Sequence, residues 1–199
     1  MKRDDLRQKL IDGTIDVIAE EGLDKATTKQ VGSKTNINEA YIYRCFNGKE
    51  DMFTKTFDFL DFELIDTMMR NVDVMYMTGL DFEIRCRVFF FKIWEFLIGN
   101  RKKCLTYVRY YYSPYFSKYS AASHKARYLP LVDKFKDAFK GEADVWMILS
   151  HILNVMLDFA VKVHNDQMPS EDNYAEHVFR VIYRSVVQYF KKEEVKSNE

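Results

Sequence analysis

Three observations predict an all-α protein. Only seven glycines and three prolines interrupt 199 residues, of which 47% are hydrophobic. The apolar residues recur at intervals of three and four, which is the period of a helix and not of a strand. Short breaks containing Gly, Pro, Ser or Asn separate these patterns. We therefore expect about nine helices, three in an amino-terminal module and the rest in a larger bundle.

The helices can be placed by their start and stop signals. The first runs from about residue 4 to 21, with Leu10 and Ile18 on its apolar stripe, and Gly22 follows where a left-handed cap belongs. Pro114 and Pro169 mark two of the later stops. We place the longer helices near residues 49–71, 80–99, 101–113, 121–139, 143–165 and 171–191.

Two very short helices lie between the first helix and residue 49. Thr27 or Thr28 can cap a helix that ends near Thr35, and Asn38 can cap another that ends near Phe46. So short a connection brings the pair together at a steep angle, which is the helix-turn-helix arrangement. These helices bury little apolar area by themselves, so contact with a partner would explain them.

The helix-turn-helix arrangement makes specific demands that this stretch meets. A small residue is needed where the helices cross, and Gly32 stands there. The turn needs a residue that tolerates a positive φ, and Asn36 is the best choice after glycine. Four apolar residues are spaced to face the first helix: Val31, Ile37, Ile42 and Phe46.

The opposite face of the second short helix is polar and basic. Ala40, Tyr43 and Arg44 point away from the core side of a helical wheel. Residues 25–49 carry five basic side chains and one acidic one, a local balance of +4, although the formal net charge of the chain is zero. A local basic face favours DNA as a partner, while an ordinary solvated helix surface is the alternative.

The stretch TTKQVGSKTNINEAYIYRCFNGKEDMF resembles the helix-turn-helix of the TetR family of bacterial transcriptional regulators. The resemblance covers roughly residues 6–60 and is most specific at the threonine pair, at Ile42-Tyr43, at Phe46 and at Gly48-Lys49-Glu50. Gly32, Asn36, Tyr41 and Cys45 depart from the usual family residues.

The resemblance implies a homodimeric DNA-binding regulator that responds to a small-molecule effector. It implies that Tyr43 and Lys49 contact phosphates, while Arg44 can reach a guanine edge. The full set of expected DNA-binding residues is Thr28, Lys29, Glu39, Ala40, Tyr41, Tyr43, Arg44 and Lys49. It also implies a DNA-binding domain over residues 1–50 and a ligand-binding and dimerisation domain over residues 51–199.

Aromatic residues crowd the part of the chain that follows. Residues 80–135 hold 15 of the 31 aromatic residues, and the helix at 88–98 is apolar nearly all round. Such a region suits a pocket for an apolar or aromatic effector, with Glu95, Arg109 or Asp158 at its polar end, although a large aromatic core is the alternative. The expected pocket residues are Phe90, Trp94, Tyr107, Tyr111, Met156 and Phe159.

The last two helices carry apolar residues on more than one face. One face serves the core, and a second can pair with another copy across a two-fold axis in a four-helix interface. The residues expected at this dimer interface are Leu153, Leu157, Val178, Ile182, Val186 and Tyr189.

Other classes of function find less support. Three cysteines without metal-type spacing, together with an amino terminus lacking an apolar signal core, indicate a cytoplasmic protein without a membrane anchor. The four histidines are not paired at helical intervals, so we expect no metal, no cofactor and no enzyme site. A helical adaptor that binds only protein stays open as the alternative.

Overall fold

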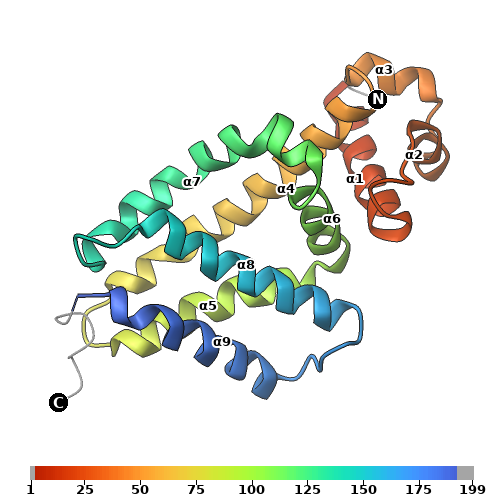
Figure 1. Cartoon of the computed structure of the whole chain (residues 1–199). Coiled ribbons are helices and arrows are strands. Elements are labelled where there is room, and N and C mark those ends of the chain that lie inside the picture. The colour runs from red at the N-terminus through yellow and green to blue at the C-terminus, as the bar shows by residue number, and fades with distance from the viewer. Residues whose placement is uncertain (1–2, 192–199) are drawn as a thin grey trace. The chain divides into compact units, whose positions relative to one another are not determined.

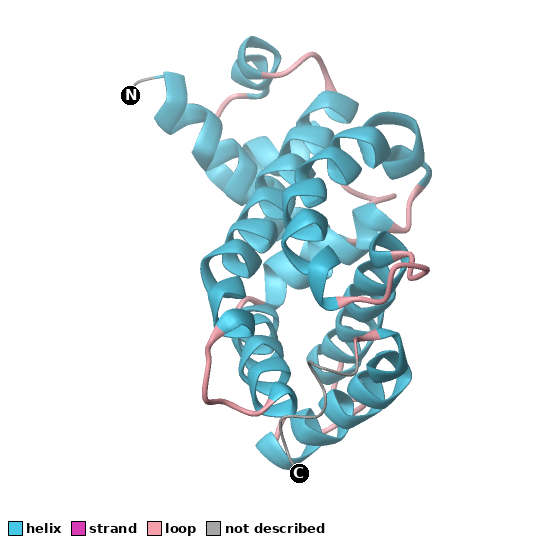
Figure 2. Ribbon diagram, turned by 90° about the vertical axis from the view of Figure 1, so that its left-hand side faces the viewer, coloured by secondary structure: helices cyan, strands magenta, loops and turns pink. Residues whose placement is uncertain are grey.

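The computed structural model describes residues 3–191, which form helices without a strand (Figures 1 and 2). Short 3-10 or π turns extend or join several of the helices. The α-helices are α1 (Arg3–Glu21), α2 (Thr28–Thr35), α3 (Ile42–Cys45), α4 (Lys49–Asn71), α5 (Phe82–Gly99), α6 (Arg101–Tyr111), α7 (Ala121–Phe135), α8 (Val145–His164) and α9 (Asp172–Val186). The all-α prediction is confirmed.

Most predicted bounds lie within a few residues of the observed ones, and α4 has the predicted bounds of 49 and 71. The predicted helices at 121–139 and 171–191 both run too far. Their ends leave the helical path because Phe139 and Phe190 form an isolated antiparallel bridge, with their rings stacked 4.2 Å apart. Burial of both rings therefore decides where these helices stop.

The chain divides into two compact units. Of the described residues, unit one comprises 3–63 and 100–124, and unit two comprises 64–99 and 125–191. α4 contributes residues to both units, and α6 belongs to unit one although it follows α5 of unit two. The expected functional boundary near residue 50 stays a prediction.

In unit one, α6 is tied to α1 by polar contacts. The hydroxyl of Thr106 donates to the Ile15 carbonyl at 3.0 Å, and the Arg109 guanidinium donates to the Ile18 carbonyl. Thr106 is almost completely buried, so its hydrogen bond is shielded from water. Unit one therefore includes the helix-turn-helix and the helix that supports it.

Unit two is built on α5, α8 and α9, which run side by side (Figure 1). Ile93 and Leu97 of α5 and Leu157 of α8 are buried in its core. The His164 imidazole Nε2 lies 3.0 Å from the Leu97 carbonyl oxygen and joins α8 to α5. α8 is the one described helix that is long and apolar enough to cross a membrane, yet Leu157 and its apolar neighbours form this core.

Candidate nucleic-acid interface and ligand cavity

The turn between α2 and the next helix has the geometry that its sequence predicts. Thr27, and not Thr28, caps α2, because its side-chain oxygen accepts the Gln30 N–H at 3.2 Å. Asn36 ends α2 in the left-handed region with φ of 53°. Asn38 caps the following turn by accepting the Ala40 N–H at 2.9 Å.

The second short helix has two parts, where the sequence predicts one. A 3-10 turn (Glu39–Tyr41) leads directly into the single α turn of α3. The predicted anchors hold this segment on the module, since Val31, Ile42 and Phe46 are buried and Ile37 is half-buried. The apolar face of this short helical segment is therefore buried within unit one.

The opposite face carries most of the predicted DNA-binding side chains. Tyr43 is 59% exposed, and its neighbour Arg44 is exposed too. Lys29, Ala40 and Tyr41 are exposed on the same module. An exposed tyrosine of this size contributes no buried apolar area to the stability of the module. Large exposed aromatic side chains of this kind are typical of a binding surface.

Arg44 and Tyr41 are in direct contact on this face. The Arg44 guanidinium carbon lies 4.8 Å from the centre of the Tyr41 ring. This cation–π stacking limits the rotamers of a long side chain while its N–H donors stay free to point outward. Arg44 is therefore partly ordered before any partner binds.

Thr28 and Glu39 are placed differently from their neighbours. Thr28 is only 9% exposed, and its hydroxyl donates to the Glu39 carboxylate. Glu39 is half-buried. In the free protein these two side chains therefore satisfy each other across the helix-turn-helix, and their contact with DNA stays a prediction.

Lys49 is the first residue of α4, a helix of 23 residues. Its ammonium lies 5.2 Å from the Phe53 ring centre, and the preceding Gly48 has a positive φ of 97°. The first backbone N–H groups of a long helix add partial positive charge at this position. The site therefore combines a mobile charge with fixed donors, as a phosphate requires.

The helix-turn-helix has fewer unpaired positive charges than its sequence indicates. The Lys34 ammonium pairs with Glu20 of α1 at 2.6 Å and is neutralised within unit one. The Glu20 carboxyl has a lowered pKa because Lys34 and Lys102 both donate hydrogen bonds to it. Placement of the remaining cations, and not their number, makes the basic face.

Three further residues of this module make contacts that its sequence pattern does not predict. Gly13 lies where α1 and α2 cross, and a Cβ at this position would overlap the Thr35 methyl group. The Arg7 guanidinium lies 5.5 Å from the Phe46 ring centre, and Arg3 donates to the Arg44 carbonyl at 3.4 Å. A glycine in the middle of a helical pattern was the one available signal for a close approach.

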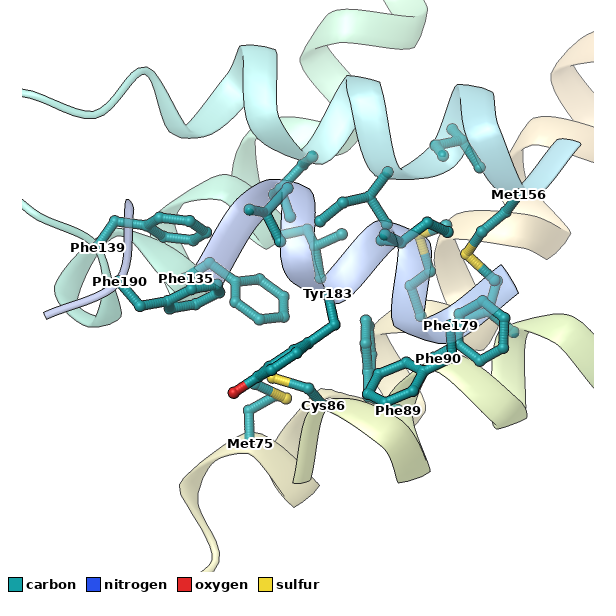
Figure 3. Close-up of a pocket in the computed structure, with 18 of the residues that line it drawn as sticks. Met75, Cys86, Phe89, Phe90, Phe135, Phe139, Met156, Phe179, Tyr183 and Phe190 are labelled. Atoms are coloured by element: carbon teal, nitrogen blue, oxygen red, sulfur yellow. The ribbon is translucent and has the colours of Figure 1, made fainter. Parts of the chain in front are cut away.

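Unit two contains an apolar cavity between α5, α7, α8 and α9 (Figure 3). About 80 Å³ of it is open to the centres of water-sized molecules. Of the expected pocket residues, Phe90 and Met156 line it. Trp94 is buried outside the lining and stacks on Phe90, and Phe159 contacts the Tyr174 ring.

The other two expected pocket residues, Tyr107 and Tyr111, lie in unit one. The Tyr107 hydroxyl donates to Asp61 at 3.1 Å, and the same carboxylate oxygen lies 2.9 Å from His124 Nδ1. The Tyr111 ring packs against His124 at 5.5 Å. Tyr107, Asp61 and His124 form a buried polar cluster of unit one. Tyr111 packs beside this cluster, and neither tyrosine lines the cavity.

The expected polar partners of an effector are also occupied elsewhere. Glu95 pairs with Lys92 at 3.5 Å, and Asp158 pairs with Lys162 at 2.6 Å. Arg109 donates to α1, as described above. None of these three charged groups lines the cavity.

The apolar stripe expected at the dimer interface turns inward. Five of its six residues are buried within a single chain, and only Tyr189 is exposed, at 37%. The outward faces of α8 and α9 instead present Met147 and Val181, exposed at 54% and 58%. The buried residues are Leu153, Leu157, Val178, Ile182 and Val186.

Residues 10–56 match the family model described as bacterial regulatory proteins, tetR family. The helix-turn-helix module of this chain therefore matches that of the TetR family. A curated relative, the biofilm operon icaADBC HTH-type negative transcriptional regulator IcaR of Staphylococcus epidermidis, is 30% identical over 71 residues. This match spans 36% of this chain, which covers 38% of that relative's length.

Solved structures resemble this chain over most of its length. A TetR family transcription regulator from Marinobacter aquaeolei has a TM-score of 0.75 at 12% identity, with 92% of this chain and 95% of that chain covered. FadR from Bacillus subtilis, in complex with stearoyl-CoA, has a TM-score of 0.68 at 19% identity, with 88% and 96% covered. At such identities the likeness shows the fold alone. The family consists of transcription regulators and not of enzymes.

Proposed function

We propose that this TetR-family protein is a DNA-binding transcription regulator that binds a palindromic operator as a homodimer. One observation carries the proposal. The helix-turn-helix buries three of its four apolar anchors and yet exposes Tyr43 and Arg44 on its opposite face. These exposed side chains do not contribute to packing within unit one. A helix of this kind fits into the major groove of DNA.

The contacts follow from the chemistry of each side chain. Tyr43 offers a phenolic donor, and Lys49 offers a charge at a helix amino terminus, so both suit phosphate oxygens. Arg44 presents a planar fork that matches the O6 and N7 atoms of guanine. Lys29 and Tyr41 flank it on the exposed surface. Phosphate contacts then position the module, and Arg44 supplies sequence preference.

A dimer would place two such modules on successive major grooves, roughly 34–36 Å apart. The exposed apolar side chains of Met147 and Val181 support a two-fold contact through the outward faces of α8 and α9. Symmetry of the protein then implies an approximate palindrome in the DNA.

Repression and release by an effector complete the proposal. IcaR is described as a negative regulator, and the FadR structure contains stearoyl-CoA, which support a repressor with an apolar ligand. α4 contributes residues to both units and so joins them covalently. A ligand with about 10²-fold preference for the DNA-incompetent state would supply about 2.7 kcal/mol of coupling, enough to release a weakly held operator.

A salt titration of DNA binding tests the proposal. Selection from a random duplex library would first supply the operator, and its affinity for the purified protein would be measured over a range of salt concentrations. We expect the logarithm of the association constant to fall linearly, with a slope of about −0.9 for each neutralised phosphate. Failure to enrich any sequence, or a slope near zero, would favour the adaptor that binds only protein.

A further inference from the structure

Arg3 and Arg7 of α1 lie against α3, although 41 positions separate Arg3 from Arg44 in the sequence. The Arg3 guanidinium donates to the Arg44 carbonyl at 3.4 Å, and the Arg7 guanidinium carbon lies 5.5 Å from the centre of the Phe46 ring. The two arginines are about one turn apart on α1 and therefore share one face of that helix. Figure 1 shows the amino-terminal end of α1 beside α3.

Both contacts are made at the carboxyl end of α3, which has a single turn. The carbonyl groups of a last turn have no partner within their own helix, and Arg3 supplies a donor to one of them. A guanidinium has five N–H donors, so this bond and the ring contact of Arg7 use only part of the capacity of the two groups. The contacts therefore hold both cations beside α3 and leave donors for a further partner.

Neither guanidinium is neutralised within the part of the chain that the structure describes. Both side chains are exposed, and no described carboxylate lies within ion-pair distance of Arg3 or Arg7. Asp4 and Asp5 leave α1 on other sides, about 100° and 200° around the helix from Arg3. The first turns of α1 therefore add two unpaired positive charges beside Arg44.

The place of these charges on DNA follows from the proposed role of Arg44. The major groove is about 8.5 Å deep, so the backbone of a residue whose side chain reaches the base edges stays near the mouth of the groove. Phosphates line both sides of that mouth. A guanidinium held at the Arg44 carbonyl is therefore within reach of a phosphate and too far back to read a base.

We infer that Arg3 and Arg7 form a phosphate clamp, in which each guanidinium binds a backbone phosphate beside the half-site that α3 reads. The paired N–H donors of a guanidinium match the oxygens of a phosphate. Lys49 begins α4 only four residues after α3 ends, so its contact would lie on the same part of the DNA backbone. The inference rests on the proposed function and deepens it, because it adds α1 to the DNA-binding surface.

The salt dependence of binding tests the clamp, with the full chain and the selected operator. Replacement of both arginines by glutamine removes the charges but keeps an N–H group that can still donate to the Arg44 carbonyl. We expect Arg3→Gln/Arg7→Gln to reduce the magnitude of the salt slope by about 1.8 for each subunit, because two phosphate contacts are lost. Affinity at 0.1 M salt should fall by at least about tenfold. The loss should have the same size on unrelated duplexes, since phosphates carry no sequence information.

Two further variants separate a phosphate contact from a purely structural role. Arg3→Lys/Arg7→Lys keeps both charges but loses the planar donors, so it should retain most of the wild-type salt slope. Lys9→Gln removes an exposed charge from another face of α1, about 200° around the helix from Arg7, and should leave the slope unchanged. Thermal melting of each variant would show that the helix-turn-helix is still folded.

An unchanged salt slope in the glutamine variant would overturn the clamp. So would a lysine variant that loses as much of the slope as the glutamine variant, because the role of the arginines would then be structural. A loss confined to one base pair of each half-site would overturn it as well, since an arginine would then read a base. In all three cases the wild type still binds its operator and the proposed regulator stands, whereas a wild type that binds no duplex removes both proposals.

Discussion

The hydroxyl of Thr28 donates a hydrogen bond of 2.5 Å to the carboxylate of Glu39. The bond joins α2 to the 3-10 turn that precedes α3, and it lies in a part-buried position. The Glu39 carboxylate therefore links the two short helical segments of the helix-turn-helix. In the proposed complex with DNA, sequence preference would come mainly from exposed neighbours of this bond, above all from Arg44.

Thr28→Val and Glu39→Gln test this hydrogen bond in a double-mutant cycle. Each single change should lower the free energy of unfolding, because it weakens or removes a part-buried charge-assisted bond. The coupling between them should be about 0.5–1.5 kcal/mol in urea unfolding. Strictly additive effects would show that the contact contributes nothing to stability.

Lys49→Ala should weaken DNA binding about equally on all sequences. Its loss should reduce the magnitude of the salt slope by about 1 for each subunit, because one phosphate contact disappears. Lys55→Ala is the matched control, since Lys55 lies on the same helix and pairs with Asp58 at 3.2 Å. Equal slopes for wild type and Lys49→Ala would remove Lys49 from the interface.

Arg44→Ala should cost about 1–3 kcal/mol at the selected operator and relax the preference at one base pair of each half-site. Arg44→Lys keeps the charge but loses the planar fork, so it should recover nonspecific affinity without recovering that preference. Binding to a set of single-base operator variants measures both effects. A loss of equal size on every variant would reassign Arg44 to phosphate contact.

Gly13→Ala should lower the free energy of unfolding by about 1–3 kcal/mol, because the added methyl group overlaps Thr35. The Thr35 side chain cannot turn aside easily, since its hydroxyl bonds to the Val31 carbonyl at 2.8 Å. Gly99→Ala is the control, because a Cβ there meets open space. Similar melting temperatures for the two variants would contradict the close crossing of α1 and α2.

Trp94→Ala should destabilise the fold by about 3–5 kcal/mol, because the indole is 6% exposed and stacks on Phe90. Operator binding should fall with it at temperatures where the variant begins to unfold. Trp94→Phe retains most of the packing and should cost clearly less. A Trp94→Ala variant that melts like wild type but loses the effector would place Trp94 in the ligand site instead.

Local physics let the sequence predict the helices and the helix-turn-helix. Caps, prolines and left-handed positions act through bonds to near neighbours, so the bounds of α4 and the turn at Asn36 could be found from the chain alone. Four exposed members of the predicted DNA-binding face, Ala40, Tyr41, Tyr43 and Arg44, lie within five consecutive residues. Their common position on one exposed face could therefore be predicted from the sequence, without information on tertiary packing.

Tertiary structure alone decided which apolar stripe meets which neighbour. α9 has two apolar faces with the same helical period, and only packing shows that Ile182 and Val186 face the cavity while Val181 faces outward. Tyr107 joins Asp61 in unit one for the same reason, since its partner lies 46 residues away in the chain. The periodicity of a sequence indicates that one face of a helix is apolar. It does not indicate which neighbour buries that face, because burial depends on contacts between residues that are distant in the sequence.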